Sequence, residues 1–288
     1  MAKARQSVLI TGCSKDGIGE ELAKQYHAKG LRVFATARNP AAMEPLRAMG
    51  IETLTLDVTN AESIASVKSQ VEKLTGGKLD ILINNAGTSY IYAASDIEMD
   101  EVRKLFEVNV FAVMAMTKAF LPLLVASGDA RILNVGSLTG VTPIPFGSVY
   151  GSSKAALHSF NDTLRVELAP FGIKVMLIVA GNIKSHITNT ETKMPDDSMY
   201  QPIEPEFRRN RLENFHAGAP ERGPIVAQIL RESLKQKPTA WLWVSKNSWL
   251  VWFVSTFRPR TAFDAIVSKR YGLSKLTQIL RSSKRKTN

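Results

Sequence analysis

The N-terminal succession of strand, glycine turn and helix constrains the fold of this 288-residue chain most strongly. A short apolar strand over residues 8–10 runs into a glycine-containing turn over residues 11–19. A plausible amphipathic helix over residues 20–28 follows and ends at Gly30. The next apolar strand, over residues 31–36, comes at the distance expected of a βαβ unit. The pattern therefore predicts an α/β protein with a parallel sheet.

The glycine turn has the features of a phosphate-binding site. Glycines allow the backbone to approach a pyrophosphate closely, and the following helix offers unpaired N–H groups and a positive dipole end. We therefore expect a dinucleotide cofactor here. The residues expected to hold it at the turn are Gly12, Ser14, Lys15, Gly17, Ile18 and Gly19.

The end of the second strand discriminates between the two nicotinamide dinucleotides. A carboxylate at this position would bind the ribose 2′-hydroxyl of NAD, but the chain reads Thr36-Ala37-Arg38. The planar guanidinium of Arg38 suits a 2′-phosphate, and Lys15 offers a second cation. The alternative is that both are ordinary solvated surface groups. The absent acid favours NADP(H) over NAD(H).

A proton-handling set is predicted around Tyr150 and Lys154. Positions i and i+4 project from one face of a helix, so the phenol and the ammonium are expected to lie side by side. A neighbouring cation favours phenolate and would lower the phenol pKa towards the working pH. Ser137 ends an apolar run over residues 131–136, where open α/β sheets build their sites, although a turn serine is the alternative reading.

These features together resemble the short-chain dehydrogenase/reductase family over roughly residues 5 to 245. The resemblance rests on the glycine turn, the Asn84-Asn85-Ala86-Gly87 element, Asn109, Ser137 and the Tyr150-x-x-x-Lys154 spacing. It implies a single-domain, Rossmann-type, doubly wound parallel sheet of about seven strands with helices on both faces. It also implies a tetrad of Asn109, Ser137, Tyr150 and Lys154, in which Ser137 bonds the substrate oxygen and Tyr150 exchanges its proton. Further cofactor contacts are implied at Asp57, Asn85, Ala86, Gly87, Tyr150, Lys154, Gly181, Ile183 and Ser185.

The chain departs from the family pattern at two places. Four residues rather than three separate Gly12 from Gly17, and Ala180-Gly181 stands where the family usually has Pro-Gly. Neither change removes a member of the implied tetrad. The extra residue lengthens the loop expected over the phosphates and is expected to shift Lys15 relative to the 2′-phosphate.

Details of the turn and of the C-terminus narrow the resemblance within the family. Three features resemble the fungal NADPH-dependent 1-acyldihydroxyacetone-phosphate reductase group: the Thr-Gly-Cys-Ser-x-x-Gly-Ile-Gly turn, the Ala-Thr-Ala-Arg strand end and the Trp-rich final segment. That group is also similar to 17β-hydroxysteroid and retinol dehydrogenases. This resemblance implies reduction of a lipid-like ketone. Three alternatives remain. The chain could be a fungal secondary-metabolite ketoreductase acting on a terpenoid or polyketide, a steroid or retinoid dehydrogenase, or a non-catalytic NADP-binding interaction module.

Composition and the N-terminus bound the remaining possibilities. No Pro/Ser/Gly-rich linker or repeat interrupts the chain, so we expect one domain over 1–245 with a substrate lid at about 184–220. Met1 to Arg5 leads directly into a strand without a signal-peptide core, and the single cysteine permits no internal disulfide. We therefore expect a cytosolic-facing enzyme. The four histidines lack metal-ligand spacing, which predicts no metal.

The C-terminal extension, residues 246–288, is apolar and then basic. All four tryptophans lie between Trp241 and Trp252, and the apolar run over 248–257 is too short to span a bilayer, which needs about 20 residues. From Arg258 onward nine Lys/Arg residues stand against Asp264, so this segment carries +8 of the net charge of +11. Peripheral docking on an endoplasmic-reticulum or lipid-droplet membrane is expected. The alternatives are packing on the core, a homodimer contact or a disordered tail in a cytoplasmic enzyme. Nucleic-acid binding is not expected because no recognition motif accompanies the charge.

Overall fold

A seven-stranded, wholly parallel sheet forms the centre of the molecule in the computed structural model, which describes residues 5–184, 187, 190–214 and 217–287. The spatial order of the strands is β3-β2-β1-β4-β5-β6-β7. Their bounds are β1 Ser7–Thr11, β2 Arg32–Ala37, β3 Glu52–Thr55, β4 Ile81–Asn84, β5 Arg131–Val135, β6 Lys174–Ala180 and β7 Trp241–Val244. This arrangement confirms the predicted Rossmann-type doubly wound sheet.

Eleven α-helices and seven shorter helical turns are present among the described residues. The α-helices are α1 Ile18–Ala28, α2 Glu44–Ala48, α3 Ala61–Thr75, α4 Met99–Phe106, α5 Ala112–Ser127, α6 Ser148–Leu168, α7 Glu204–Phe207, α8 Arg222–Ser233, α9 Ser248–Phe257, α10 Asp264–Arg270 and α11 Leu273–Thr287. The short turns are η1 Pro40–Met43, η2 Ala94–Asp96, η3 Glu107–Phe111, η4 Leu138–Gly140, η5 Ala169–Phe171, η6 Gln201–Ile203 and η7 Arg208–Glu213.

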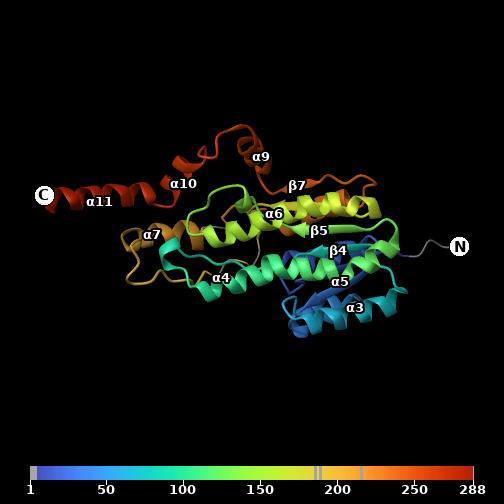
Figure 1. The fold of residues 1–288 in the computed structure, drawn as a ribbon. Coiled ribbons are helices and arrows are strands. Elements are labelled where there is room, and N and C mark those ends of the chain that lie inside the picture. The colour runs from blue at the N-terminus through green and yellow to red at the C-terminus, as the bar shows by residue number, and fades with distance from the viewer. Residues whose placement is uncertain (1–4, 185–186, 188–189, 215–216, 288) are drawn as a thin grey trace.

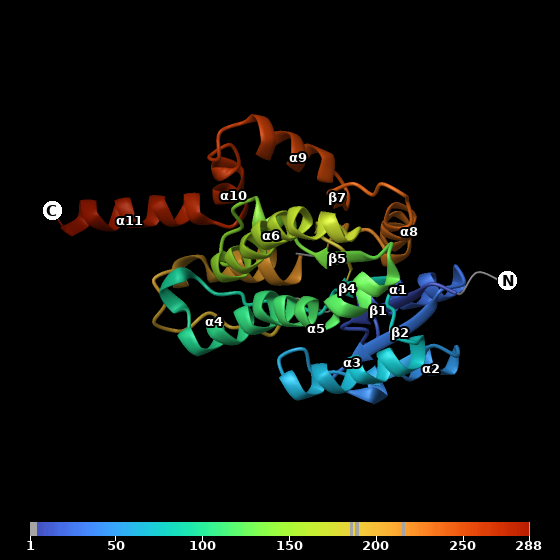
Figure 2. The same ribbon diagram turned by 45° about the vertical axis from the view of Figure 1, so that its right-hand side comes forward.

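Helices cover both faces of the sheet, as Figures 1 and 2 show, and each face has its own hydrophobic cluster. Helices α1, α2 and α8 bury residues such as Tyr26 and Val226 against one face. Helices α3, α5 and α6 bury Val67, Phe120 and Leu164 against the other. Strands covered on both faces are mainly apolar, which explains the buried runs Val8-Leu9-Ile10 of β1 and Ile81-Leu82-Ile83 of β4.

The strand order reverses between β1 and β4, and this reversal determines where a ligand can bind. β1 pairs with β2 on one side and with β4 on the other, so the connections that leave these strands turn in opposite directions. A crevice opens at the carboxyl ends of strands at such a switch point. The glycine turn follows β1 and the Asn85-Ala86-Gly87 segment follows β4, so both lie at this crevice.

The C-terminal extension packs partly on the body of the protein. Tyr271 and Leu276 join Phe146, Ile203 and Phe207 in a third hydrophobic cluster. The predicted lid therefore contains more regular structure than expected, because η6, α7 and η7 fold within it and bury apolar side chains in this cluster. Beyond these contacts, α11 projects away from the sheet, as Figures 1 and 2 show.

One helical segment of the described residues, Met99–Ser127, has the length and composition of a membrane span. It includes α4, η3 and α5, and Met116, Phe120 and Leu124 on it belong to the core packed against the sheet. We therefore interpret it as a core helix. The apolar helix α9 is shorter than a bilayer is thick.

Candidate active site

A cavity of about 1150 Å³ opens along the carboxyl ends of the central strands. The glycine turn and Arg38 line one end of it, and Ser137, Tyr150 and Lys154 line its middle. The C-terminal extension contributes Val251, Phe263, Val267, Arg270 and Tyr271 to its wall. One continuous cavity thus joins the two groups of residues that the sequence predicts separately.

The glycine turn is held against β4 by close packing. Gly12 has φ +73°, and a Cβ there would lie 2.8 Å from Ala86 Cα. A Cβ on Gly19 would lie 2.3 Å from the Gly12 carbonyl oxygen. Asn85 Nδ2 donates to the carbonyl oxygens of Thr11 and Gly12 at 2.8 and 3.0 Å. Gly19, which lies outside the cavity lining, therefore shapes the turn, whereas Gly17 and Ile18 present the start of α1 to the cavity.

The arrangement fits a dinucleotide phosphate group. Gly17 is the extended residue before α1, whose first N–H groups have no intrahelical partner, and Gly12 and Gly17 line the cavity without side chains. Ser14 and Lys15 line the same end of the cavity. The extra residue in this turn does not remove either one from the lining.

The cavity end near β2 and β3 is cationic. The exposed side chains of Lys15 and Arg38 both line it, together with Asp57. Hydrogen bonds from the Thr59 backbone N–H and hydroxyl lower the pKa of Asp57, and the charge of Arg38 lowers it further. Asp57 is thus a fixed carboxylate near Arg38, and it lines the cavity where it can accept hydrogen bonds from a ligand.

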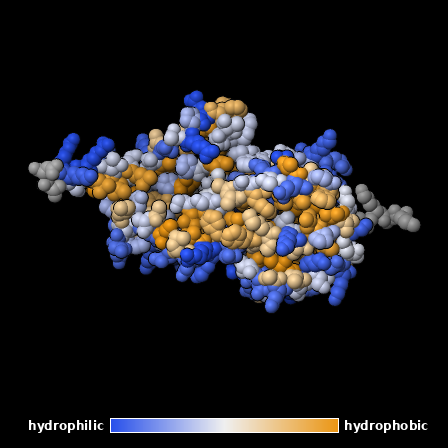
Figure 3. Space-filling view, viewed as in Figure 1, coloured by the Kyte–Doolittle hydropathy of each residue, from blue (hydrophilic) through white to orange (hydrophobic). Residues whose placement is uncertain are grey.

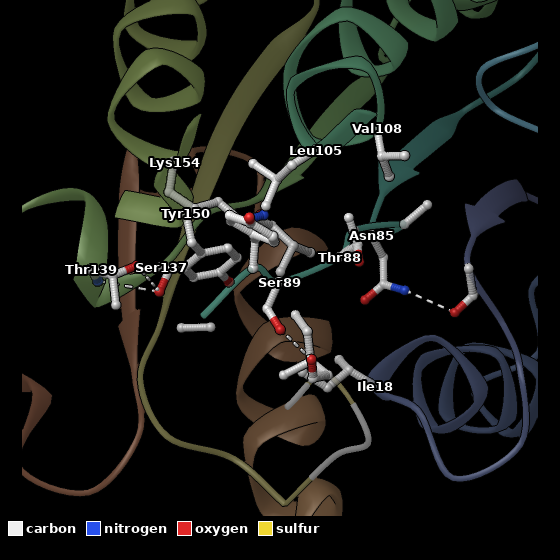
Figure 4. Close-up of a pocket in the computed structure, with 18 of the residues that line it drawn as sticks. Ile18, Asn85, Thr88, Ser89, Leu105, Val108, Ser137, Thr139, Tyr150 and Lys154 are labelled. Atoms are coloured by element: carbon white, nitrogen blue, oxygen red, sulfur yellow. Dashed lines mark hydrogen bonds between the residues drawn. The ribbon is translucent and has the colours of Figure 1, made fainter. Parts of the chain in front are cut away.

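Helix α6 brings Tyr150 and Lys154 to the carboxyl end of β5, beside Ser137 (Figure 4). Lys154 Nζ lies 5.8 Å from the centroid of the Tyr150 ring and donates to the Val135 carbonyl oxygen at 2.8 Å. The Thr139 hydroxyl donates to Ser137 Oγ at 2.9 Å. Ser137 also forms a hydrogen bond with the Tyr150 side chain, so its hydroxyl links Thr139 to the phenol.

The predicted lowering of the Tyr150 pKa is wrong for this structure. Desolvation raises the pKa of the phenol, and the hydrogen bond with Ser137 and the charge of Arg211 offset this only in part. Desolvation also lowers the pKa of Lys154 to about 8. Tyr150 is consequently a protonated phenol at neutral pH, which suits a proton donor.

Asn109 lies behind the cavity wall and contributes no surface to it. It is fully buried in the π-helical turn η3, where its Oδ1 accepts from the Thr88 N–H at 2.9 Å and its Nδ2 donates to the Thr88 carbonyl at 2.9 Å. A Cβ on Gly87 would lie 3.4 Å from Asn109 Oδ1 and 3.6 Å from Lys154 Nζ. These two polar groups therefore converge on Gly87.

Of the remaining predicted cofactor contacts, all but one line the cavity. Asn85, Ala86, Gly87, Gly181 and Ile183 line the cavity. Ser185 lies outside the described residues. Within the described part of the chain, no group of three or more His, Cys, Asp or Glu side chains has a metal-binding arrangement.

Several cavity residues are not predicted from the sequence. Thr88, Ser89 and Tyr90 follow directly from the Asn-Asn-Ala-Gly element, and extending that motif would find them. In contrast, the basic run of Arg208, Arg209 and Arg211 can be read from the sequence as an attraction for an anionic substrate, although a solvated helix face is the preferred reading. Arg211 alone of the three is buried and lines the cavity. The wall residues from α9 and α10 have no local pattern that distinguishes them from surface positions.

The burial of Lys154 predicts a pH-dependent cost to stability. Below pH 8 its amine is protonated in both the folded and the unfolded protein, and the folded state bears the desolvation cost. Between pH 8 and 10.5 the unfolded state binds more protons, so the contribution of Lys154 to the free energy of unfolding becomes more favourable as the pH rises. Relative to Lys154→Met, wild type should gain up to about 3 kcal/mol across this window. Urea unfolding without added cofactor measures this, and a difference that stays flat with pH would contradict the assignment.

The sequence matches a family model described as short chain dehydrogenase over residues 6–196. Short-chain dehydrogenase srdE of Neurospora crassa is 39% identical over 272 residues, which cover 94% of this chain and 93% of the relative. An NADPH-dependent 1-acyldihydroxyacetone phosphate reductase of Schizosaccharomyces pombe is 38% identical over 272 residues, covering 92% and 88%. A short-chain dehydrogenase structure from Streptomyces avermitilis has a TM-score of 0.76 at 26% identity, covering 98% and 99%. The chain therefore belongs to the short-chain dehydrogenase/reductase family of oxidoreductases.

Proposed function

We propose that this protein is an NADPH-dependent ketoreductase that interconverts a ketone and a secondary alcohol, with Tyr150 as the general acid and base. The observation that carries the proposal is the convergence of Ser137, Tyr150 and Lys154 on the middle of one cavity. The other end of that cavity has a glycine turn and two cations. The cofactor that supplies the hydride and the side chains that supply the proton would therefore lie next to each other in one cavity.

NADP(H) is the proposed cofactor, and the chain's own residues favour it over NAD(H). Arg38 and Lys15 lie at the end of the cavity where a 2′-phosphate would bind, and β2 ends without a carboxylate. The relative from Schizosaccharomyces pombe is itself named as NADPH-dependent. When bound, the cofactor supplies the hydride.

The protein's residues supply positioning and the proton. Ser137 donates a hydrogen bond to the substrate carbonyl oxygen, and Tyr150 gives that oxygen its proton as negative charge develops there. Lys154 places a positive charge beside the phenol and offers N–H donors to ribose hydroxyls. Asn109 fixes the loop at Thr88 and supports the wall next to Lys154.

The proposed substrate is a lipid-like ketone. The wall of the cavity that holds Tyr150 includes Leu105, Ile144, Val251, Phe263 and Val267, which suits a substrate with an apolar body. The named activity of the Schizosaccharomyces pombe relative supports 1-acyldihydroxyacetone phosphate as the first candidate. A terpenoid or polyketide ketone and a steroid or retinoid are the competing substrates.

We also propose that α9 docks on a membrane or lipid-droplet surface. Trp249 and Phe257 on this helix are 66% and 62% exposed, and Trp252 and Phe253 are exposed beside them. Figure 3 shows hydrophobic atoms on this part of the surface, at the top of the view. Exposed Lys246, Arg258 and Arg260 flank the helix, which matches an anionic lipid surface. A homodimer contact stays an alternative use of this segment.

Replacing Tyr150 by Phe tests the proposed chemistry. Without the hydroxyl, turnover of whichever ketone is a substrate should fall by about 10²–10⁴-fold, while NADPH affinity stays within about twofold. Tyr92→Phe, outside the cavity lining, is the matched control. NADPH oxidation would be followed with acyl-dihydroxyacetone phosphate, steroid, retinoid and polyketide ketones. Undiminished turnover by Tyr150→Phe would refute the role of the phenol, and no wild-type turnover on the whole panel would favour an interaction module.

Arg38→Asp tests the 2′-phosphate site. Loss of a charge-assisted hydrogen bond and introduction of an acid should weaken NADPH binding about 10–100-fold and leave NADH binding within about threefold. Arg47→Asp is the control, because Arg47 is exposed on α2 outside the cavity lining. Dissociation constants come from fluorescence titration. Equal weakening of both cofactors would argue against the assignment.

Vesicle flotation tests the docking surface. The Trp249→Ser/Trp252→Ser variant should bind vesicles containing about 30% anionic lipid at least tenfold more weakly than wild type, since two interfacial aromatic anchors are lost. Met49→Ser/Leu74→Ser removes two exposed apolar side chains elsewhere and should bind as wild type does. Raised salt should weaken wild-type binding, because it screens the flanking basic groups. Equal flotation by both variants would rule out α9 as the anchor.

A further inference from the structure

A third polar side chain on α6 reaches the site, one turn beyond Lys154. His158 is only 4% exposed, and its Nε2 accepts a hydrogen bond from the Ser137 backbone N–H at 3.2 Å. Tyr150, Lys154 and His158 are spaced four residues apart and thus occupy neighbouring turns on one side of the helix. The helix that carries the proton donor therefore also bonds directly to the residue that orients the substrate oxygen.

Two glycines enclose the imidazole ring. A Cβ on Gly136 would lie 2.5 Å from His158 Nε2, and a Cβ on Gly140 would lie 2.5 Å from its Cε1. These glycines lie on either side of Ser137 in the sequence. The loop at the end of β5 is therefore shaped around the ring. On another side the ring meets Trp241 of β7 edge-on, with centroids 5.1 Å apart.

Stability alone does not explain a histidine here. Nε2 accepts a hydrogen bond, so the neutral ring carries its proton on Nδ1, and that buried nitrogen has no hydrogen-bond partner among the described residues. Burial of such a donor is costly. Desolvation and the charge of Lys154 lower the pKa of His158 to about 4, which keeps the ring neutral and able to accept at physiological pH. His158 lowers the stability of the fold and yet bonds to a residue of the site, which indicates that its role is functional.

We propose that His158 is a positioning residue that holds Ser137 at a fixed distance and orientation relative to Tyr150. Through its hydrogen bond to the Ser137 N–H, it fixes the backbone that aims the serine hydroxyl at the substrate oxygen. Lys154 anchors the start of the same loop by donating a hydrogen bond to the carbonyl oxygen of Val135, the residue before Gly136. The effect on catalysis rests on the proposed ketoreductase function, whereas the hydrogen bond can be tested without it.

Substitution by Met and by Gln separates the hydrogen bond from ring packing. Both side chains are unbranched and similar in length, but only Gln offers a strong acceptor near the position of Nε2. His158→Met should lower kcat about tenfold or more with KM for NADPH within about twofold, because the glycine turn is unaffected. His158→Gln should retain most of kcat. His27→Met, on α1 outside the cavity lining, is the control and should match wild type.

Amide hydrogen exchange at Ser137, measured by NMR on the protein without cofactor, provides a readout independent of activity. Exchange should be at least tenfold faster in His158→Met than in wild type, and close to wild type in His158→Gln. Melting temperatures should stay within about 3 °C of each other.

The outcomes separate the two proposals. If wild type reduces no ketone but Ser137 exchange follows the predicted order, the ketoreductase function fails and the positioning bond stands. If the wild type is active and His158→Met keeps full kcat, or if Met and Gln lose kcat and thermal stability to the same extent, the positioning role is overturned.

Discussion

The docking of α6 onto the carboxyl end of β5 is the interaction on which the site depends. Buried hydrogen bonds connect α6 to the end of β5 and to the loop that follows it: the Asn134 amide donates to Asn161 at 3.0 Å, the Val135 carbonyl accepts from Lys154, and the Ser137 N–H donates to His158. Buried polar groups tolerate little displacement, because each unmade bond costs about 1–3 kcal/mol. The helix therefore sets the distance between Ser137 and Tyr150 rigidly.

A second rigid contact places the cofactor end of the cavity. Thr11 Oγ1 accepts from the N–H groups of Asn85 and Ala86 at 3.0 and 2.9 Å, while Asn85 Nδ2 bonds back to the glycine turn. The two loops that follow β1 and β4 are thus tied across the switch point of the sheet. Because β4 also pairs with β5, the cationic end and the α6 end of the cavity share one framework. Pre-organised geometry of this kind supports both hydride and proton transfer.

The parts of the site that could be predicted are those whose chemistry depends on local sequence. The glycine turn requires small residues at fixed positions, and Tyr150 with Lys154 requires only helical spacing, so both are visible in the chain. The wall formed by Phe263 and Val267 depends on how a distant segment folds back, which no local pattern encodes.

The direction of the Tyr150 pKa shift could not be predicted for a related reason. Helical spacing reveals the nearby cation, but desolvation by the surrounding residues has the larger effect on the phenol, and only the assembled fold provides that burial.

Deuterium transfer from NADPH labelled at nicotinamide C4 is the most direct test of the central claim that this cavity carries out ketone reduction. Wild-type protein would be incubated with the labelled cofactor and the ketone panel, and the products analysed by mass spectrometry and NMR. We expect an alcohol that carries one deuterium on its carbinol carbon, with a single configuration at that carbon. Alcohol formed without deuterium from the labelled position, or no alcohol from any ketone, would contradict it.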